Sequence, residues 1–160
     1  MNVNGKNSVG LDLAATGLVI EKLGEVLAGY QVFYTNLRGL HWNIQGDKFF
    51  ELHPIYEEYY GEMADRIDET AERIVILGGV PANSFSDYLK ISRVKEVSGV
   101  SCWKTGSNNV IETLQLLIGL LRELRELAVK AGDQGTLSLA THAIKSFEKK
   151  VWMLSAYVKD

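Results

Sequence analysis

The spacing of apolar residues is the feature that most constrains this chain, because it predicts four long helices and one long connection. Apolar side chains recur every three or four residues through each of four segments, which places them along one face of a helix. The connection between the second and third segments covers residues 79–106 and contains one short helical candidate at 85–89. The four predicted helices span about residues 12–44, a segment that begins between 47 and 53 and ends at 78–79, residues 109–131, and residues 136–157.

The order helix, helix, long crossover, helix, helix is that of the ferritin-like bundles rather than of simple up-and-down bundles. We therefore predict an all-α, ferritin-like four-helix bundle whose long crossover carries a short helix. A chain of 160 residues suits one domain, 1–160, with a full core. Residues 1–11 precede the first helix and are expected to form a flexible N-terminal segment. Pro54 leaves open whether the second helix starts near His53 or is irregular there.

Composition excludes several classes of protein. Cys102 is the only cysteine, so the chain has no intrachain disulfide framework and no Cys-based zinc ribbon, and a reducing cytoplasm is the expected compartment. The N-terminus does not have the pattern of a signal peptide, and no apolar run approaches the ~20 residues that span a bilayer. Packing is the favoured role for the Cys102 side chain, and an exposed thiol that holds a haem or a metal is the minority alternative.

The second predicted helix carries most of the candidate metal ligands. At about 100° per residue and with His53 at zero, Glu57 falls near 40°, Asp68 near 60° and Glu72 near 100°. One face therefore combines an imidazole with three carboxylates, which is the ligand set of iron, manganese or zinc sites. A solvated acidic face is the simpler interpretation, but the presence of His53 and two flanking tyrosines favours a metal site.

One helix cannot bring all of these side chains to one ion. His53 and Glu72 are 19 residues apart, which is about 28 Å along a helix. The chain also lacks the Glu-x-x-His motif with which bundle di-iron enzymes build a site inside one subunit. If two copies of this helix pack antiparallel about a twofold axis, His53 of one copy lies beside Asp68 and Glu72 of the other. Such a dimer would hold two equivalent sites, roughly 25 Å apart.

Several short segments, taken together with their spacing, resemble the Dps family (DNA-binding protein from starved cells), the mini-ferritins of bacteria and archaea. The resemblance covers nearly the whole chain, from the first helix to the last. The segments that carry it are HWNIQG at 41–46, FFELH at 49–53, DETAER at 68–73, LGG at 77–79 and EKKVWML at 148–154.

The resemblance implies a shell of twelve subunits, built from twofold dimers, that acts as an oxidoreductase. Such a shell oxidises Fe(II), typically with hydrogen peroxide, and stores the Fe(III) mineral, which protects against oxidative damage. The resemblance places the ferroxidase centre between two subunits, with metal ligands His41 and His53 from one and Asp68 and Glu72 from its twofold mate. Glu57 stands where the family usually has Asp, and its extra methylene alters how it reaches the metal.

Two further residues are candidates with alternatives. Trp42, beside His41, either packs against the centre or donates an electron, and packing is favoured. Asp133 lies just before the last predicted helix, where the family lines threefold pores that admit iron with acidic residues. A lone Asp at that place also fits a favourable interaction with the helix dipole.

A different function, a DNA-compacting structural protein, is the alternative hypothesis. Relatives that bind DNA do so through Lys- and Arg-rich tails, which neutralise phosphates. Here Lys6 is the only basic residue among the first ten, and the chain ends Lys159-Asp160. Twelve copies at −3 each give a formal charge of −36, so DNA binding is expected to be weak or absent.

Overall fold

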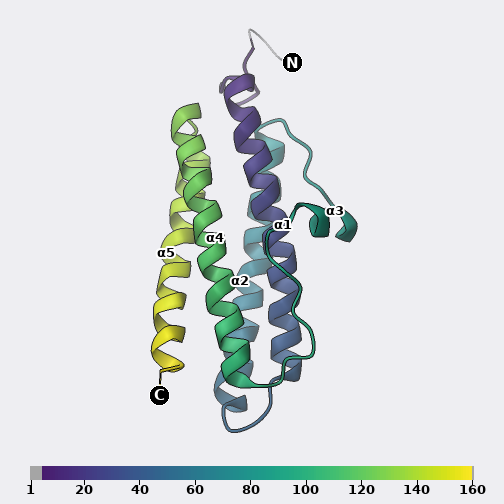
Figure 1. The fold of residues 1–160 in the computed structure, drawn as a ribbon. Coiled ribbons are helices and arrows are strands. Elements are labelled where there is room, and N and C mark those ends of the chain that lie inside the picture. The colour runs from purple at the N-terminus through teal and green to yellow at the C-terminus, as the bar shows by residue number, and fades with distance from the viewer. Residues whose placement is uncertain (1–4, 160) are drawn as a thin grey trace.

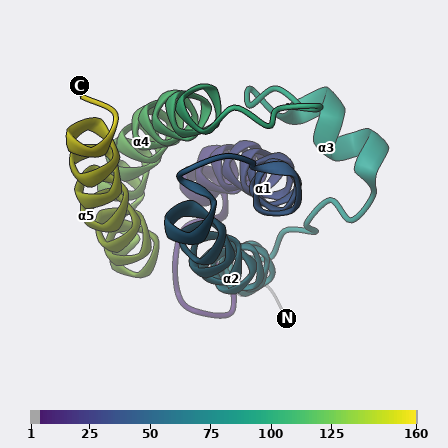
Figure 2. The same cartoon turned by 90° about the horizontal axis from the view of Figure 1, so that it is seen from below.

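Five helices make up the computed structural model, which describes residues 5–159 (Figure 1). Helices α1, α2, α4 and α5 form the bundle, and the short helix α3 packs outside it against α1 (Figure 2). None of the helices in the described part of the chain is long and apolar enough to cross a membrane. The helices are α1 Leu13–Asn43, α2 Phe49–Ile76, α3 Phe85–Ile91, α4 Trp103–Ala131 and α5 Gln134–Tyr157.

The long crossover sets the topology of the bundle. It leaves the end of α2, runs the length of the bundle past α3, and returns to the end at which α2 began (Figure 1). As a result α2 and α4 run in the same direction, and α1 and α5 run in the opposite one. The Asn36 amide anchors the crossover to α1, because it donates to Lys95 O at 2.8 Å and accepts from Val97 N at 2.9 Å. The predicted all-α, ferritin-like bundle with a helix in its crossover is therefore confirmed.

Helix α4 begins six residues earlier than its predicted start at residue 109. Residue 109 is therefore not a helix start, because the helix already runs through it from Trp103. Gly106 explains the difference: a Cβ atom there would lie 3.1 Å from Leu40 Cδ2 and 3.6 Å from Ile44 Cδ1. Glycine has low helix propensity, but its missing side chain lets α4 approach α1 closely at Gly106. Packing between the two helices therefore outweighs the local preference against a helix.

The residues before α1 belong to the segment that was predicted to be flexible. Residues 1–4 of the segment predicted to be flexible, 1–11, lie outside the described residues. From residue 5 onward the segment forms a hydrogen-bonded turn around the buried Asn7 side chain, whose Oδ1 accepts from Leu11 N at 2.9 Å. Asn7 Nδ2 donates to Leu77 O at the end of α2 at 3.2 Å. This turn closes the end of the bundle opposite the α1–α2 connection.

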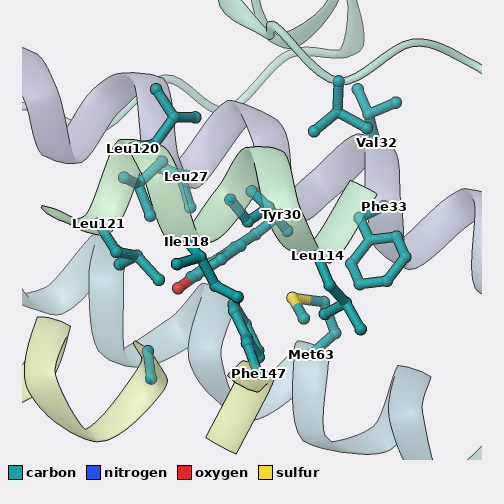
Figure 3. Close-up of a cluster of buried hydrophobic side chains, with 14 of the residues drawn as sticks. Leu27, Tyr30, Val32, Phe33, Met63, Leu114, Ile118, Leu120, Leu121 and Phe147 are labelled. Atoms are coloured by element: carbon teal, nitrogen blue, oxygen red, sulfur yellow. The ribbon is translucent and has the colours of Figure 1, made fainter. Parts of the chain in front are cut away.

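Tyr30 lies in the middle of the hydrophobic core, and Figure 3 shows its hydroxyl oxygen surrounded by apolar side chains. Its ring meets that of Phe147 edge to face, with 6.0 Å between centroids. The hydroxyl has no hydrogen-bond partner among the described residues, and burial raises the pKa of Tyr30, so the group stays protonated. A buried, unpaired donor costs free energy that the rest of the core must offset.

We expect Tyr30→Phe to stabilise the protein, because it removes this unpaired hydroxyl and keeps the ring. The free energy of unfolding, measured by urea denaturation, should rise by about 1 kcal/mol. Tyr56→Phe is the matched control, since the buried Tyr56 hydroxyl lies 3.3 Å from Ser107 Oγ and its loss should destabilise. A Tyr30→Phe variant that is less stable than wild type would contradict the prediction.

The contact between α2 and α5 contains an ionic cluster centred on Glu62. Its carboxylate accepts from Lys150 Nζ at 2.8 Å, from Arg66 Nη2 at 2.6 Å and from Ser146 Oγ at 2.9 Å. Burial by itself would raise the pKa of Glu62, but the hydrogen bonds from Lys150, Arg66 and Ser146 outweigh it and lower the pKa to about 2. The charged form of Glu62 therefore joins α5 to α2.

This cluster predicts a loss of stability in acid. Because the folded-state pKa of Glu62 is lower than its ordinary value of 4.5, its contribution is complete above about pH 5 and falls as the pH drops towards 2. Glu62→Gln should be less stable than wild type at pH 7 and should lose less stability between pH 5 and pH 3 in urea titrations. Glu58→Gln, at an exposed position of the same helix, is the control and should keep the wild-type slope. If the free energy of unfolding falls equally with pH in Glu62→Gln and in wild type, Glu62 is not the source of the acid sensitivity.

Candidate metal centre

The connection between α1 and α2 brings two histidines face to face. The turn at residues 44–48 is tight, with Gly46 at a positive φ of 95°, and Gln45 N donates to Ser101 O at 3.0 Å, which ties the turn to the start of α4. Since α1 and α2 run antiparallel on either side of this turn, His41 in the last turn of α1 lies opposite His53 in the second turn of α2.

Each histidine ring is hydrogen-bonded to the backbone of the other. Nδ1 of His41 lies 2.8 Å from the carbonyl oxygen of His53, and Nδ1 of His53 lies 2.9 Å from that of His41. The rings stack with 3.8 Å between centroids and 20° between planes. A carbonyl oxygen only accepts, so both Nδ1 atoms carry the hydrogen and the lone pair of each neutral ring is on Nε2. This second bond on the ring is how proteins orient imidazole ligands towards a metal.

The end of a helix supplies one of these acceptors. The carbonyl of His41 belongs to the last turn of α1, where no residue further along the helix donates to it. The side chain of His53 fills this place and so caps α1 while it is itself oriented. Phe49 stacks on the other face of the His53 ring at 4.9 Å between centroids, and the His41 side chain is buried. The His53 ring is therefore stacked between His41 and Phe49, and the histidine pair is ordered within a single chain.

Glu57 lies one helical turn after His53 and belongs to the same cluster of predicted ligands. Its side chain is exposed, and its Oε1 lies 3.5 Å from the hydroxyl of Tyr60. The ring of Tyr60 meets the His41 ring edge to face, at 5.4 Å between centroids. The structure thus pairs His41 with His53, and Tyr60 contacts both His41 and Glu57. Sequence reasoning counted Tyr60 only as an aromatic neighbour and missed its contact with both kinds of ligand.

Asp68 and Glu72 lie towards the opposite end of α2, and both are exposed. At 1.5 Å per residue they are about 22 and 28 Å from His53 along the helix axis. Glu72 borders an open hollow of about 550 Å³ that Glu69 and His142 also line. Within residues 5–159 of one chain, no three His, Cys, Asp or Glu side chains are close enough together to hold a metal ion.

Trp42 follows His41 in the last turn of α1, and its side chain is 62% exposed. The guanidinium carbon of Arg38 is 4.7 Å from the centroid of its ring and 5.4 Å from that of Tyr34. The neighbour of Trp42 in the single chain is therefore Arg38, a cation–π contact on the surface. Whether Trp42 packs against the centre or donates an electron stays a prediction.

Cys102 is exposed, which corrects the expectation of a packing role. It occupies the N-cap position of α4, where its side chain faces solvent rather than the core. The Thr105 backbone and hydroxyl, followed by the Lys104 backbone, lower the pKa of the Cys102 thiol. Cys102 thus stands where Ser or Thr is more usual, but its side chain makes no capping hydrogen bond to the helix.

Asp133 is buried in the single chain, directly before the first residue of α5. Its carboxylate caps α5, because it accepts from Thr136 N at 2.9 Å and from Thr136 Oγ1 at 2.5 Å. It also forms an ion pair with Arg73 of α2, whose Nε donates to Thr136 Oγ1 at 3.0 Å. Both carboxylate oxygens are used inside the chain, so the helix-end interpretation of Asp133 is the one that the geometry supports.

We expect Asp133→Ala to destabilise the protein by about 3 kcal/mol, because it removes the cap of α5 and leaves Arg73 without its partner. Asp133→Asn keeps an acceptor for Thr136 N and should lose less. Both values can be measured by urea denaturation, with the exposed Asp65→Ala as control. An Asp133→Asn variant of wild-type stability that takes up iron more slowly would restore the pore assignment.

Comparisons with known proteins agree with this architecture. The model of the ferritin-like domain family matches residues 20–160. A DNA protection during starvation protein of Porphyromonas gingivalis is 47% identical over 139 residues, which cover 87% of each chain. DNA protection during starvation protein 2 of Bacillus anthracis is 34% identical over 142 residues, covering 89% of this chain and 97% of that protein.

A solved structure extends the agreement to three dimensions. The crystal structure of a Dps protein from Vibrio cholerae O1, described as a member of a broad superfamily of ferritin-like diiron-carboxylate proteins, matches with a TM-score of 0.96 at 42% identity. The match covers 99% of this chain and all of that one. Fold, sequence and matched length agree, and the chain belongs to the Dps family of ferritin-like proteins.

Proposed function

We propose that this protein is an iron-storing ferroxidase that binds Fe(II) between two copies of its own chain. It oxidises the iron, with hydrogen peroxide as the oxidant, and keeps the Fe(III) mineral inside a shell of twelve subunits in the cytoplasm. The observation that carries the proposal is the pair of oriented imidazoles: His41 and His53 both carry the hydrogen on Nδ1 and leave Nε2 free. Two neutral imidazoles held in this way by backbone carbonyls fit a metal site.

A second copy of the chain supplies the missing ligands in this proposal. Asp68 and Glu72 lie too far along α2 to reach the histidines of their own chain. An antiparallel α2 from a twofold partner places them beside His41, His53 and Glu57. Large apolar side chains exposed on α2 and on the crossover that follows it support such a partner, because exposed apolar surface often marks a protein–protein interface. These residues, with their exposed fractions, are Phe50 at 88%, Val75 at 58%, Val80 at 92% and Phe85 at 77%.

The ligand set suits ferrous iron as a substrate. Imidazole and carboxylate hold Fe(II) while leaving coordination positions open for an oxidant. Two Fe(II) ions give one electron each to one peroxide molecule, whose O–O bond breaks, and with two protons the products are two Fe(III) ions and two water molecules. Because both electrons come from iron, no hydroxyl radical is released. The harder Fe(III) then hydrolyses and is stored as mineral.

Direct DNA compaction is not required for this function. Two relatives carry the name DNA protection during starvation protein, and removal of Fe(II) and peroxide would protect DNA without touching it. From residue 5 onward the N-terminal segment folds back onto the bundle through Asn7, and its backbone at Lys6 forms an isolated β-bridge with that of Asp12. Lys6 is the one basic residue of this segment. We therefore propose that DNA binding is weak or absent.

Complementation between two inactive variants tests the two-chain centre. His53→Ala and the double variant Asp68→Ala, Glu72→Ala should each be nearly inactive, because every centre then lacks ligands. When the two chains are co-expressed in equal amounts, about half of the dimers are mixed and one of their two centres is intact, so about a quarter of wild-type activity returns. Activity is measured as the rise of ferric absorbance after peroxide is added to anaerobic protein with Fe(II).

The wild-type protein and each variant expressed alone are the controls. Mixed shells of native mass that recover no activity would disprove the intersubunit centre. A wild-type protein that oxidises Fe(II) no faster than the His53→Ala variant would overturn the ferroxidase itself.

A further inference from the structure

Tyr60 touches both a predicted imidazole ligand and a predicted carboxylate ligand. Its ring meets that of His41 edge to face at 5.4 Å between centroids and 82° between planes. Its hydroxyl is 3.5 Å from Oε1 of Glu57, at the long end of the range for a hydrogen bond. Such bonds are often long in a site without its substrate and shorten when the substrate binds.

The ring of Tyr60 is held in place independently of Glu57. Tyr34 on α1 meets it edge to face, with 6.1 Å between centroids and 90° between planes. Two rings of α1, those of Tyr34 and His41, therefore contact this one side chain of α2. The Tyr60 side chain is half-buried, so its hydroxyl has a defined position next to an exposed carboxylate.

Among the predicted ligands of this end of α2, Glu57 has the least ordered side chain. His41 and His53 are each oriented by a backbone carbonyl, whereas the Glu57 side chain is exposed and has three rotatable bonds. Ordering a Glu side chain on binding costs conformational entropy. The Tyr60 hydroxyl is a donor that can reduce this cost, because it favours the rotamers that keep the carboxylate beside the His41–His53 pair.

We propose that Tyr60 is a positioning residue of the iron site: it holds the carboxylate of Glu57 towards the two imidazoles and so strengthens Fe(II) binding. This inference rests on the proposed ferroxidase function and adds a residue to its site. The alternative is that Tyr60 only packs against His41. The two roles are separable, because Tyr60→Phe removes the hydroxyl and keeps both ring contacts.

Anaerobic titration calorimetry with Fe(II) on shells of native mass is the experiment. The Tyr60→Phe variant loses the hydrogen bond from the Tyr60 hydroxyl to the charged Glu57 side chain. Its affinity for Fe(II) should therefore be about three- to tenfold lower than that of the wild type. Tyr34→Phe is the matched control, since it removes a phenol hydroxyl from the adjoining ring and should stay within about twofold of wild type. Wild-type affinity in Tyr60→Phe would overturn the proposal.

A double-mutant cycle with Glu57→Ala identifies the partner of the hydroxyl. If Tyr60 acts through Glu57, Tyr60→Phe has no further effect in the Glu57→Ala background. If it weakens binding by the same factor there, Tyr60 does not act through Glu57 and the proposal is wrong. Wild-type protein that neither binds nor oxidises Fe(II) would refute the proposed function itself. Active wild-type protein with an unchanged Tyr60→Phe refutes only the role of Tyr60.

Discussion

Two hydrogen bonds between imidazole rings and backbone carbonyls join α1 to α2 at the end of the bundle where these two helices are connected. Each ring of the His41–His53 pair donates to the main chain of the other residue, so the last turn of α1 and the second turn of α2 are joined twice. The same bonds fix the tautomer of both rings and leave Nε2 available. These bonds cap α1 in the fold, and in the proposed function they also orient two ligands. A substitution that removes either ring changes both.

Because α2 is a continuous helix, Asp68 and Glu72 cannot reach the histidines of their own chain. A helix of 28 residues holds its side chains at fixed separations along its axis. The carboxylates of Asp68 and Glu72 are therefore held away from their own histidines as firmly as the histidines are held together. In the proposed function the centre forms only when two chains meet. Folding of the subunit and formation of the site are separate steps, and the exposed apolar residues of α2 and the crossover belong to the second.

Apolar periodicity predicted the four long helices, the crossover and the short helix within it, because these elements depend on patterns that repeat along the chain. The start of α4 escaped prediction because Gly106 is read locally as a helix breaker, while its role is to let Leu40 approach. The histidine pair escaped for another reason: its acceptors are backbone carbonyls, which every residue has. Asp133 was recognised as a candidate, but only the structure places Arg73 against it, and that contact supports its role at the end of α5.

The interior of the bundle differs from that of proteins that hold a di-iron site inside one subunit. Ferritin-like di-iron proteins hold metal between carboxylates that project inward from facing helices. Here the acid at the α2–α5 contact, Glu62, is already neutralised by Arg66 and Lys150, and Arg66 also lies over the ring of Phe147 at 5.0 Å. Tyr30 presents a neutral hydroxyl, because burial raises its pKa. Two fixed cations and a protonated phenol make this part of the core unfavourable for a further cation, which agrees with the proposed site between two chains.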